Sequence, residues 1–213
     1  MALVLAAGLT VGLTLASAGH PARGVAVVPA SYQQACAAEP GVCRSGVRGA
    51  IPAALTRQLH LSRVAGAACP VTPGTNYAGP YVVGQRYGTG PAWMVLGDRG
   101  DPARGVSVLG QPGQPGWLAA ENVLLIGKGY QGPLSVRGVR LDGPGEASFG
   151  IAETTTFIEP PAPGDANDHD GYRTPPATIW VRTPGCYAFQ INGERFTETI
   201  VISMTAPANS AMG

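Results

Sequence analysis

The sequence predicts an all-β protein of the sandwich or barrel type, preceded by an irregular lead-in. From Cys69 onward, short apolar runs recur between turn-forming residues, which is typical of closely spaced antiparallel strands. Glycine and proline account for 31 and 20 of the 213 residues, and both supply the backbone angles that tight turns need. Four cysteines follow an export-like N-terminal segment, which indicates a disulfide-stapled fold.

The length fits one domain of ordinary size or one domain plus a tail, and the composition argues against several classes of protein. Charged residues make up 13% of the chain, about half of the roughly 25% that is usual in soluble domains. The formal net charge is +1, so nothing in the composition indicates binding to nucleic acid or to an anionic membrane surface. The absence of a fixed sequence repeat argues against solenoid and propeller folds.

Residues 1–18 have the features of a secretory signal peptide. The segment is uncharged and strongly apolar, and it ends in Ala16-Ser17-Ala18, the small-x-small pattern that signal peptidase reads. We therefore predict cleavage after Ala18 and a secreted or extracytoplasmic, cell-surface location. Because the segment lacks lysine and arginine, two alternatives stay open: an uncleaved membrane anchor and a buried apolar segment.

The four cysteines are predicted to form two disulfides. The local pair Cys36–Cys43 encloses Pro40-Gly41, which is placed to turn the chain back. The remaining pair, Cys69–Cys186, would join the start of the β-region to one of its last strands. A zinc site is the alternative, but the cysteines lack the close C-x₂-C spacing of such sites, and the three histidines are scattered.

Residues 19–68 are predicted to be an irregular lead-in with a short helix. Residues 51–65 are the best helical candidate, because Pro52 suits the first turn of a helix and Gly66 suits its end. His60 falls within this candidate, and we interpret its side chain as solvated or capping.

Residues 69–204 are predicted to form the β-domain, followed by a frayed tail over 205–213. Its strand-like apolar runs, each bounded by Gly, Pro, Asn or Asp, are residues 81–83, 93–96, 106–109, 123–126 and 134–141.

The end of the β-domain carries the clearest pattern. Residues 178–182 and 186–191 are strand-like, and Asn192-Gly193 is a strong hairpin signal because both positions tolerate a positive φ. In the returning segment, alternate apolar residues predict an antiparallel strand with one buried face: Phe196, Ile200, Ile202 and Met204.

The chain resembles a group of uncharacterised exported bacterial proteins. The likeness covers roughly residues 69–203 and rests on the Cys-Pro-Val start at Cys69, on Tyr130 to Pro133, on Arg140 to Gly145, which is similar to the group's R-x-L-D-G-P strand end, and on the T-P-G-C-aromatic strand at Thr183 to Tyr187. The resemblance implies an immunoglobulin-like antiparallel β-sandwich in which the first and last cysteines of the module face each other. It implies no activity and carries over no catalytic residue.

The residues offer no clear catalytic motif, so we predict a protein that is not an enzyme. The sequence contains no G-x-S-x-G nucleophile elbow and no cysteine outside the predicted disulfides. A small secreted hydrolase is kept as an alternative. Its paired carboxylates would come from acids that we interpret as solvated surface residues: Glu146, Glu153 and Glu159.

The segment from Asp165 to Gly171 is the densest polar cluster. Asp165, Asn167 and His169 alternate as the first ligands of a calcium loop do. The glycine falls one position late, however, and Pro176 stands where the bidentate glutamate of such a loop belongs. We therefore interpret the segment as a flexible acidic loop and predict no metal and no cofactor.

Several aromatic residues are candidates for a ligand-binding surface, because aromatic rings present large amphipathic contact areas. Packing within the fold is the ordinary alternative for each of them, and Trp180 is assigned to the core. The candidates are Trp93, Trp117, Tyr81, Tyr87 and Tyr130.

These observations together predict a secreted, non-enzymatic module that binds or supports a protein or glycan partner. A carbohydrate-binding accessory domain is the main alternative, and an aromatic row on one exposed face would favour it. Nucleic acid is not an expected partner, and membrane contact is expected only if residues 1–18 are an uncleaved anchor.

Overall fold

The computed structural model describes residues 29–38, 49–64, 66–79, 82–97, 105–110, 115–150, 156–159, 168–169 and 171–206. The predicted signal peptide, Cys43, Tyr81 and most of the predicted tail lie outside these residues. Neither of the two helices in the described part of the chain has the length and hydrophobicity that crossing a bilayer requires.

In the described part of the chain, the helices are α1 (Tyr32–Ala38) and the 3₁₀ helix η1 (Ala53–Thr56), which both precede the strands. The strands are β1 (Gly74–Ala78), β2 (Val83–Tyr87), β3 (Ala92–Leu96), β4 (Val106–Ser107), β5 (Leu109–Gly110), β6 (Leu118–Ile126), β7 (Leu134–Arg140), β8 (Glu146–Gly150), β9 (Phe157–Glu159), β10 (Asp168–His169), β11 (Tyr172–Arg173), β12 (Pro176–Val181), β13 (Gly185–Gly193) and β14 (Thr197–Thr205).

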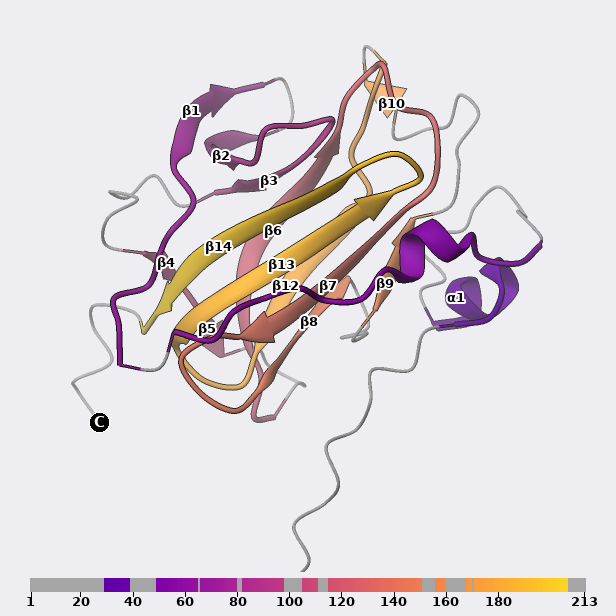
Figure 1. Ribbon diagram of the computed structural model, residues 1–213. Helices are drawn as coiled ribbons and strands as arrows, with labels where there is room; N and C mark the ends of the chain where they lie inside the picture. The colour runs from indigo at the N-terminus through magenta and orange to yellow at the C-terminus, as the bar shows by residue number, and fades with distance from the viewer. Residues whose placement is uncertain are drawn as a thin grey trace, which may run out of the picture.

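All described strands belong to one hydrogen-bonded sheet (Figure 1). Its main order is β1-β2-β3-β6-β12-β8-β7-β13-β14-β4, and β5, β9, β10 and β11 pair beside this path. The short β14–β4 pairing is parallel, whereas the other pairings are antiparallel. The prediction of a mostly antiparallel β-protein is confirmed, while the immunoglobulin-like arrangement stays a prediction.

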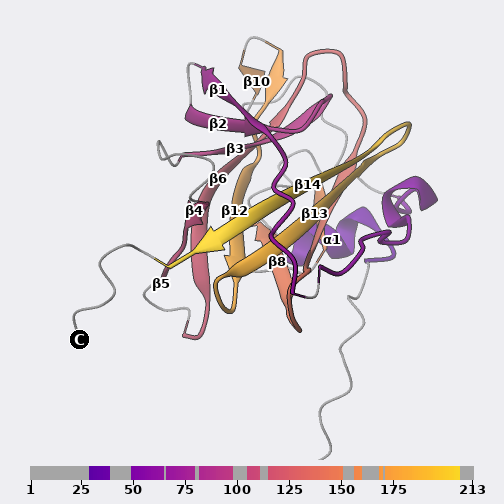
Figure 2. The same cartoon turned by 60° about the vertical axis from the view of Figure 1, so that its left-hand side comes forward.

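The sheet curls so that two of its parts share one apolar core. Figure 2 shows β13 and β14 crossing in front of β6 and β12, and one cluster of buried side chains takes residues from all four strands. Phe149 of β8 lies 5.4 Å from Phe157 and 6.4 Å from Phe189, measured between ring centroids. Burying each such side chain stabilises the fold by about 1.5–3 kcal/mol.

The two facing parts are also linked by the segment of β4 and β5. β4 pairs with β14, and β5 pairs with β6 on the facing part. Between these two short strands, the Val108 N–H donates a hydrogen bond to the Thr205 carbonyl, at 2.9 Å. The segment therefore joins the two parts of the sheet a second time, in addition to β8, which lies between β12 and β7 in the strand order.

The predicted C-terminal hairpin is confirmed. Asn192 pairs with Thr197 across β13 and β14, and the Gly193 N–H donates to the Phe196 carbonyl at 3.0 Å. Ile200, Ile202 and Met204 are buried, while the residues between them are less buried. The period of two along β14 thus places its apolar residues in the core, as the sequence pattern indicates.

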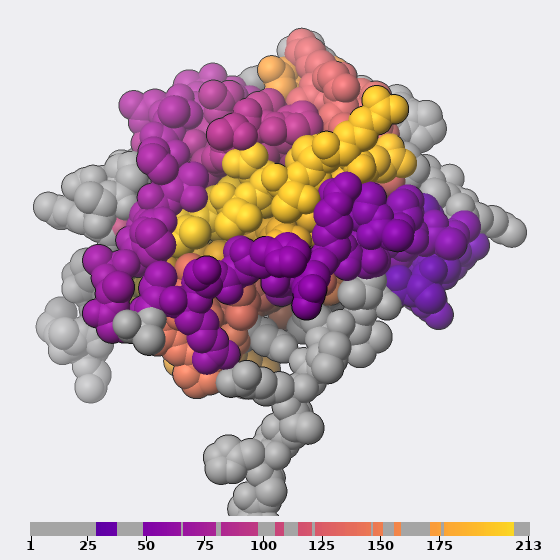
Figure 3. Space-filling model, viewed as in Figure 1, coloured from indigo at the N-terminus to yellow at the C-terminus, as the bar shows by residue number. Residues whose placement is uncertain are grey.

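The helix predicted over residues 51–65 is wrong, because only η1 is helical and residues 57–64 have no regular secondary structure. Residues 51–64 and 66–72, here called the strap, run along the outer face of β7, β13 and β14 (Figure 3). Strap carbonyls that a helix would pair internally accept hydrogen bonds from the sheet instead. The Ser135 hydroxyl donates to the Leu55 carbonyl at 2.5 Å, and the Gln190 amide donates to the Gln58 carbonyl at 3.2 Å.

Strand β13 is consequently buried on both faces. Gln190 pairs with Arg137 and Asn192 pairs with Ser135 across β13 and β7, and all four side chains are buried beneath the strap. Arg137 donates to the Arg57 carbonyl, and burial lowers the pKa of the Arg137 guanidinium. These polar side chains can be buried because the strap backbone supplies hydrogen-bond partners.

Arg57 fastens the strap to the tip of the β13–β14 hairpin. Its guanidinium donates to the carbonyls of Gly193 and Phe196 at 2.8 Å each, and to that of Glu194 at 2.9 Å. One planar side chain therefore satisfies three carbonyls at the point where the hairpin turns.

A disulfide between Cys69 and Cys186 fastens the other end of the strap, and this predicted pair is confirmed. Cys186, Leu141 and Ala188 form a second, smaller core with apolar residues of the strap, including Leu61 and Val64. Cys36 is also disulfide-bonded. Cys43, which we predict as its partner, lies outside the described residues.

Replacing both Cys69 and Cys186 by serine is expected to lower the free energy of unfolding by about 2–5 kcal/mol, because this disulfide closes a long loop. Urea denaturation of the variant and of the oxidised wild type measures the difference. Equal unfolding free energies would contradict the role of the disulfide in holding the strap.

Arg57→Ala is expected to destabilise the protein by roughly 2–4 kcal/mol, because it removes charge-assisted hydrogen bonds and leaves carbonyls of the hairpin without a donor. Arg63→Ala is the matched control, since Arg63 is an exposed arginine of the same strap. Chemical denaturation should separate the two variants. Similar losses in both would show that the contacts of Arg57 are not what holds the strap.

Candidate binding surface

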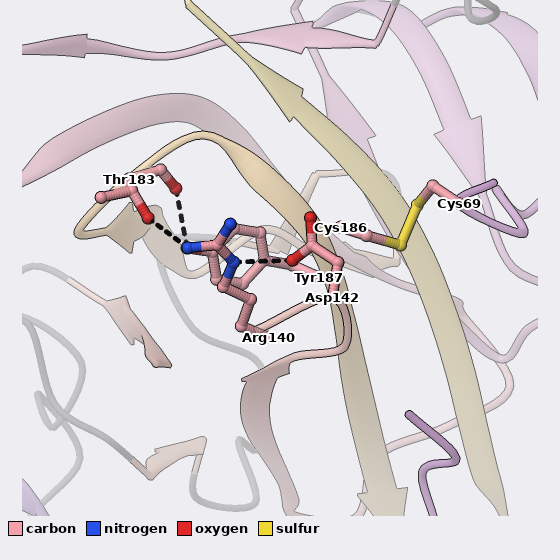
Figure 4. Close-up of polar contacts among 6 residues, drawn as sticks. All are labelled: Cys69, Arg140, Asp142, Thr183, Cys186 and Tyr187. Carbon is pink, nitrogen blue, oxygen red and sulfur yellow. Dashed lines mark hydrogen bonds and ion pairs between the residues drawn. A yellow bond between two sulfur atoms is a disulfide. The ribbon is translucent and has the colours of Figure 1, made fainter. Parts of the chain in front are cut away.

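Two of the sequence motifs meet beside the disulfide (Figure 4). Arg140 ends β7 opposite Tyr187 of β13, so that the loop after Arg140 lies against the segment that leads into β13. The Arg140 guanidinium donates from Nε to the Asp142 carboxylate and from Nη1 to the Thr183 hydroxyl, both at 2.6 Å. The Tyr187 hydroxyl donates to the Thr183 carbonyl at 2.7 Å.

We call Arg140, Asp142, Thr183 and Tyr187 the motif cluster. Its acidic and basic side chains form an ion pair with each other. The hydrogen bond from Arg140 holds the pKa of the Asp142 carboxyl below its usual value, and it raises the pKa of the Arg140 guanidinium. Burial raises the pKa of the Tyr187 hydroxyl. Because the acid and the base of the cluster neutralise each other, we interpret the cluster as a clamp that positions the Cys186 strand for its disulfide.

The predicted aromatic candidates do not gather on one surface. Tyr87 is only 2% exposed and belongs to the core. Tyr130 packs edge-on against Phe196 at the hairpin tip, and its hydroxyl donates to Pro133 and accepts from the Glu194 N–H. Trp117 lies beneath the Arg182 guanidinium, 3.7 Å from the ring centroid. Tyr81 lies outside the described residues.

Trp93 is part of a different group, which the sequence pattern did not reveal. The guanidinium carbon of Arg86, on β2, lies 5.3 Å from the Trp93 ring centroid and 5.6 Å from that of Tyr77 on β1. Tyr87 and its partner Met94 point into the core. Side chains alternate along a strand, so the neighbours Arg86 and Trp93 face the opposite side, away from the core.

Two more residues extend this group. The Lys128 ammonium lies 5.2 Å from the ring centroid of Tyr172, on β11. Burial raises the pKa of the Tyr77 hydroxyl, and the neighbouring Tyr172 raises it further. We call these residues the aromatic–cation patch; its members are Tyr77, Arg86, Trp93, Lys128 and Tyr172.

Glycines determine where the Trp93 ring lies. A Cβ at Gly127 would come within 3.1 Å of the ring, and a Cβ at Gly90 within 2.4 Å. Gly90 also has a φ of +97°, which side chains other than glycine rarely adopt. The ring therefore lies close over backbone that carries no side chain.

Two residues of the aromatic–cation patch, Arg86 and Lys128, are cationic. The one ion pair among the described residues joins Arg140 to Asp142, so no described carboxylate neutralises Arg86 or Lys128. The Nε of Arg86 is buried and has no hydrogen-bond partner. The patch thus combines partly exposed rings with two cations whose charge the described part of the chain leaves uncompensated.

Other predicted sites gain no support from the described residues. No group of three His, Cys, Asp or Glu side chains in them is arranged to hold a metal ion. Of the acidic segment, Asp168 and His169 form β10, while Asp165 and Asn167 lie outside the described residues. Glu153 also lies outside them.

The remaining residues singled out in the sequence are two glutamates, which lie at strand ends, and one tryptophan, which lies in the interior. Glu146 begins β8, and Glu159 ends β9. Trp180, assigned to the core, is buried, and its indole N–H donates to the Gly150 carbonyl at 2.9 Å.

Comparison with known proteins gave no match. Neither a protein-family model, nor a curated protein, nor a solved structure matches the chain. Evidence for a function therefore comes from the contacts of the chain's own residues.

The stabilising effect of Asp142 is expected to depend on pH. Its folded-state pKa lies below the usual value, so the stabilisation is present above the unfolded-state pKa of roughly 3.9 and is lost as the pH falls through the folded-state pKa. Because the carboxylate is partly exposed, Asp142→Asn should cost no more than about 1 kcal/mol near neutral pH.

Urea titrations of the wild type and of Asp142→Asn at about pH 7 and about pH 2 measure this difference, which should shrink on acidification. Because the asparagine variant has no carboxyl at this position, it is the reference that lacks the ionisation of Asp142 at both pH values. An equal difference at both pH values would show that ionisation of Asp142 does not stabilise the clamp.

Proposed function

We propose that this protein is a non-enzymatic binding module that acts outside the cytoplasm. The observation that carries the proposal is the aromatic–cation patch, because recognition surfaces combine aromatic contact area with a few oriented polar groups. A location outside the cytoplasm is supported by the Cys69–Cys186 disulfide, since stable disulfides form mainly in oxidising compartments. The export-like segment at residues 1–18 agrees with this location.

We further propose that the curled sheet is a variant of the immunoglobulin-like sandwich, as the resemblance to the exported bacterial group implies. The shared core between β6–β12 and β13–β14 supports this proposal. One feature distinguishes the molecule: the Cys69–Cys186 disulfide lies outside that core and joins the strap to β13, whereas antibody domains place their disulfide between the two sheets. A crystal structure with a closed barrel would contradict the sandwich interpretation.

Thermal melting of the intact, oxidised protein tests the binding function. A ligand that binds only the folded state raises the melting temperature. At a concentration one hundred times its Kd, it adds about 2.7 kcal/mol to the free energy of unfolding. We expect such a shift with at least one member of a panel of cell-wall and plant polysaccharides and isolated cell envelopes. Trp93→Ala should abolish the shift, and Trp117→Ala, which alters an aromatic–cation contact elsewhere, should retain it.

The same samples distinguish binding from catalysis. Release of reducing sugar ends or of free acids from the panel would contradict a non-enzymatic role and favour the small secreted hydrolase. The protein can also be incubated with isolated cell envelopes and its retention on them measured. An unchanged melting temperature with every member of the panel, together with no retention on cell envelopes, would refute the binding function itself.

A further inference from the structure

We propose that the aromatic–cation patch binds an acidic glycan, specifically a chain that contains hexuronate units. This inference rests on the proposed binding function and specifies the chemistry of its ligand. The patch is formed by β1, β2, β3 and β11 together with the turn after β6, so that one ligand lying across these strands would contact all of it.

The rings supply the part of the surface that suits a sugar. Tyr77, Trp93 and Tyr172 are each partly exposed. They lie on β1, β3 and β11 of the same sheet, with β2 between β1 and β3 and β6 between β3 and β11. An aromatic ring offers a flat apolar area, and one side of a pyranose presents mainly C–H groups, so the two can pack face to face. Several rings in one patch suit a chain of sugars better than a single small molecule.

Arg86 indicates that the sugar is acidic. Its guanidinium lies near the rings of both Tyr77 and Trp93, and its buried Nε has no hydrogen-bond partner. A partly desolvated cation gains most from an anion that accepts two parallel hydrogen bonds, and a carboxylate has this geometry. The guanidinium would therefore pair with the carboxylate of a sugar whose ring packs on the neighbouring aromatic side chains.

Lys128 provides a second positive charge beside Tyr172. Two cations, each next to a ring, match a polymer that repeats a carboxylate and an apolar face along its length. A neutral glycan would offer neither cation an anionic partner. The charge complementarity of the patch thus favours a polyuronate over a neutral polysaccharide.

Single-stranded nucleic acid also stacks on aromatic rings and pairs with cations. The chain as a whole argues against it, because the formal net charge is only +1 and proteins that bind nucleic acid usually carry a strong basic surface. The Cys69–Cys186 disulfide also favours a compartment in which extracellular polysaccharides are the commoner polymers.

Isothermal titration of the intact, oxidised protein with an oligogalacturonate tests the proposal. The controls are a galactose oligomer of the same length and linkage and an oligothymidylate. We expect binding of the oligogalacturonate that weakens between about 0.05 and 0.5 M salt, because the ion pairs are screened. Trp93→Ala and Arg86→Gln should each weaken binding roughly tenfold or more.

Arg182→Gln is the matched control, since it removes a cation that lies over an aromatic ring, Trp117, outside the patch. It should leave the affinity for the oligogalacturonate unchanged. Thermal melting confirms that each variant is folded, and Trp93→Phe replaces Trp93→Ala if the latter does not fold. We expect Trp93→Phe to retain more affinity than any variant that removes the ring.

The outcomes separate the two proposals. Equal binding of the neutral and acidic oligomers, or no effect of Arg86→Gln, would overturn the proposal that the ligand is acidic and leave the binding function intact. Tighter binding of the oligothymidylate than of the oligogalacturonate would overturn the proposal that the ligand is a glycan. Retention on cell envelopes that the patch variants do not affect would place binding on another surface, whereas no binding to any probe or envelope would refute both proposals.

Discussion

The burial of β13 on both faces is the constraint on which the rest of the structure depends. Its inner face carries Phe189 and Ile191 into the main core, and its outer face carries Gln190 and Asn192 under the strap. A buried amide without a hydrogen-bond partner costs roughly 1–3 kcal/mol. The strap must therefore present its backbone to the sheet, so it cannot form the helix that its sequence allows.

The same constraint positions the candidate binding surface. The strap continues from Cys69 directly into β1, and Thr72 exchanges two hydrogen bonds with Val201 of β14, at 2.9 and 2.8 Å. The disulfide and Thr72 thus fix the start of β1, the edge strand that carries Tyr77. The placement of the aromatic–cation patch depends in this way on contacts on a different face of the molecule.

The motif cluster and the patch illustrate two different uses of arginine. Arg140 is paired with Asp142 and Thr183, and it ties the loop after β7 to the start of β13. Arg86 has ring neighbours and no described anionic partner. The first arrangement is satisfied within the chain and stabilises it, whereas the second leaves a charge available for a ligand.

Much of the fold could be predicted because its signals are local. The hairpin at Asn192-Gly193 follows from backbone preferences of two adjacent residues, and the buried face of β14 follows from its period of two. The pair Cys69–Cys186 follows by elimination, because the turn at Pro40-Gly41 favours a local pair between the other two cysteines, Cys36 and Cys43. Each of these signals depends on neighbours in the sequence and needs no knowledge of distant contacts.

The candidate site was mostly beyond such reasoning. Tyr77, Arg86 and Tyr172 come from separate segments, and only strand order brings them together. Tyr87 illustrates the difficulty: it adjoins Arg86, yet it lies in the core, because adjacent residues of a strand point to opposite faces and register decides which face is buried.

By itself, the sequence determined the mostly antiparallel β class of the fold, several of its strands and its long-range disulfide, because periodicity, turn residues and cysteine spacing are local properties. It did not predict β1 or β8 to β11. Only the tertiary structure decided that the lead-in is a strap and which aromatic side chains share a surface. The physical reason is that both depend on hydrogen-bond partners and strand neighbours that lie far away along the chain.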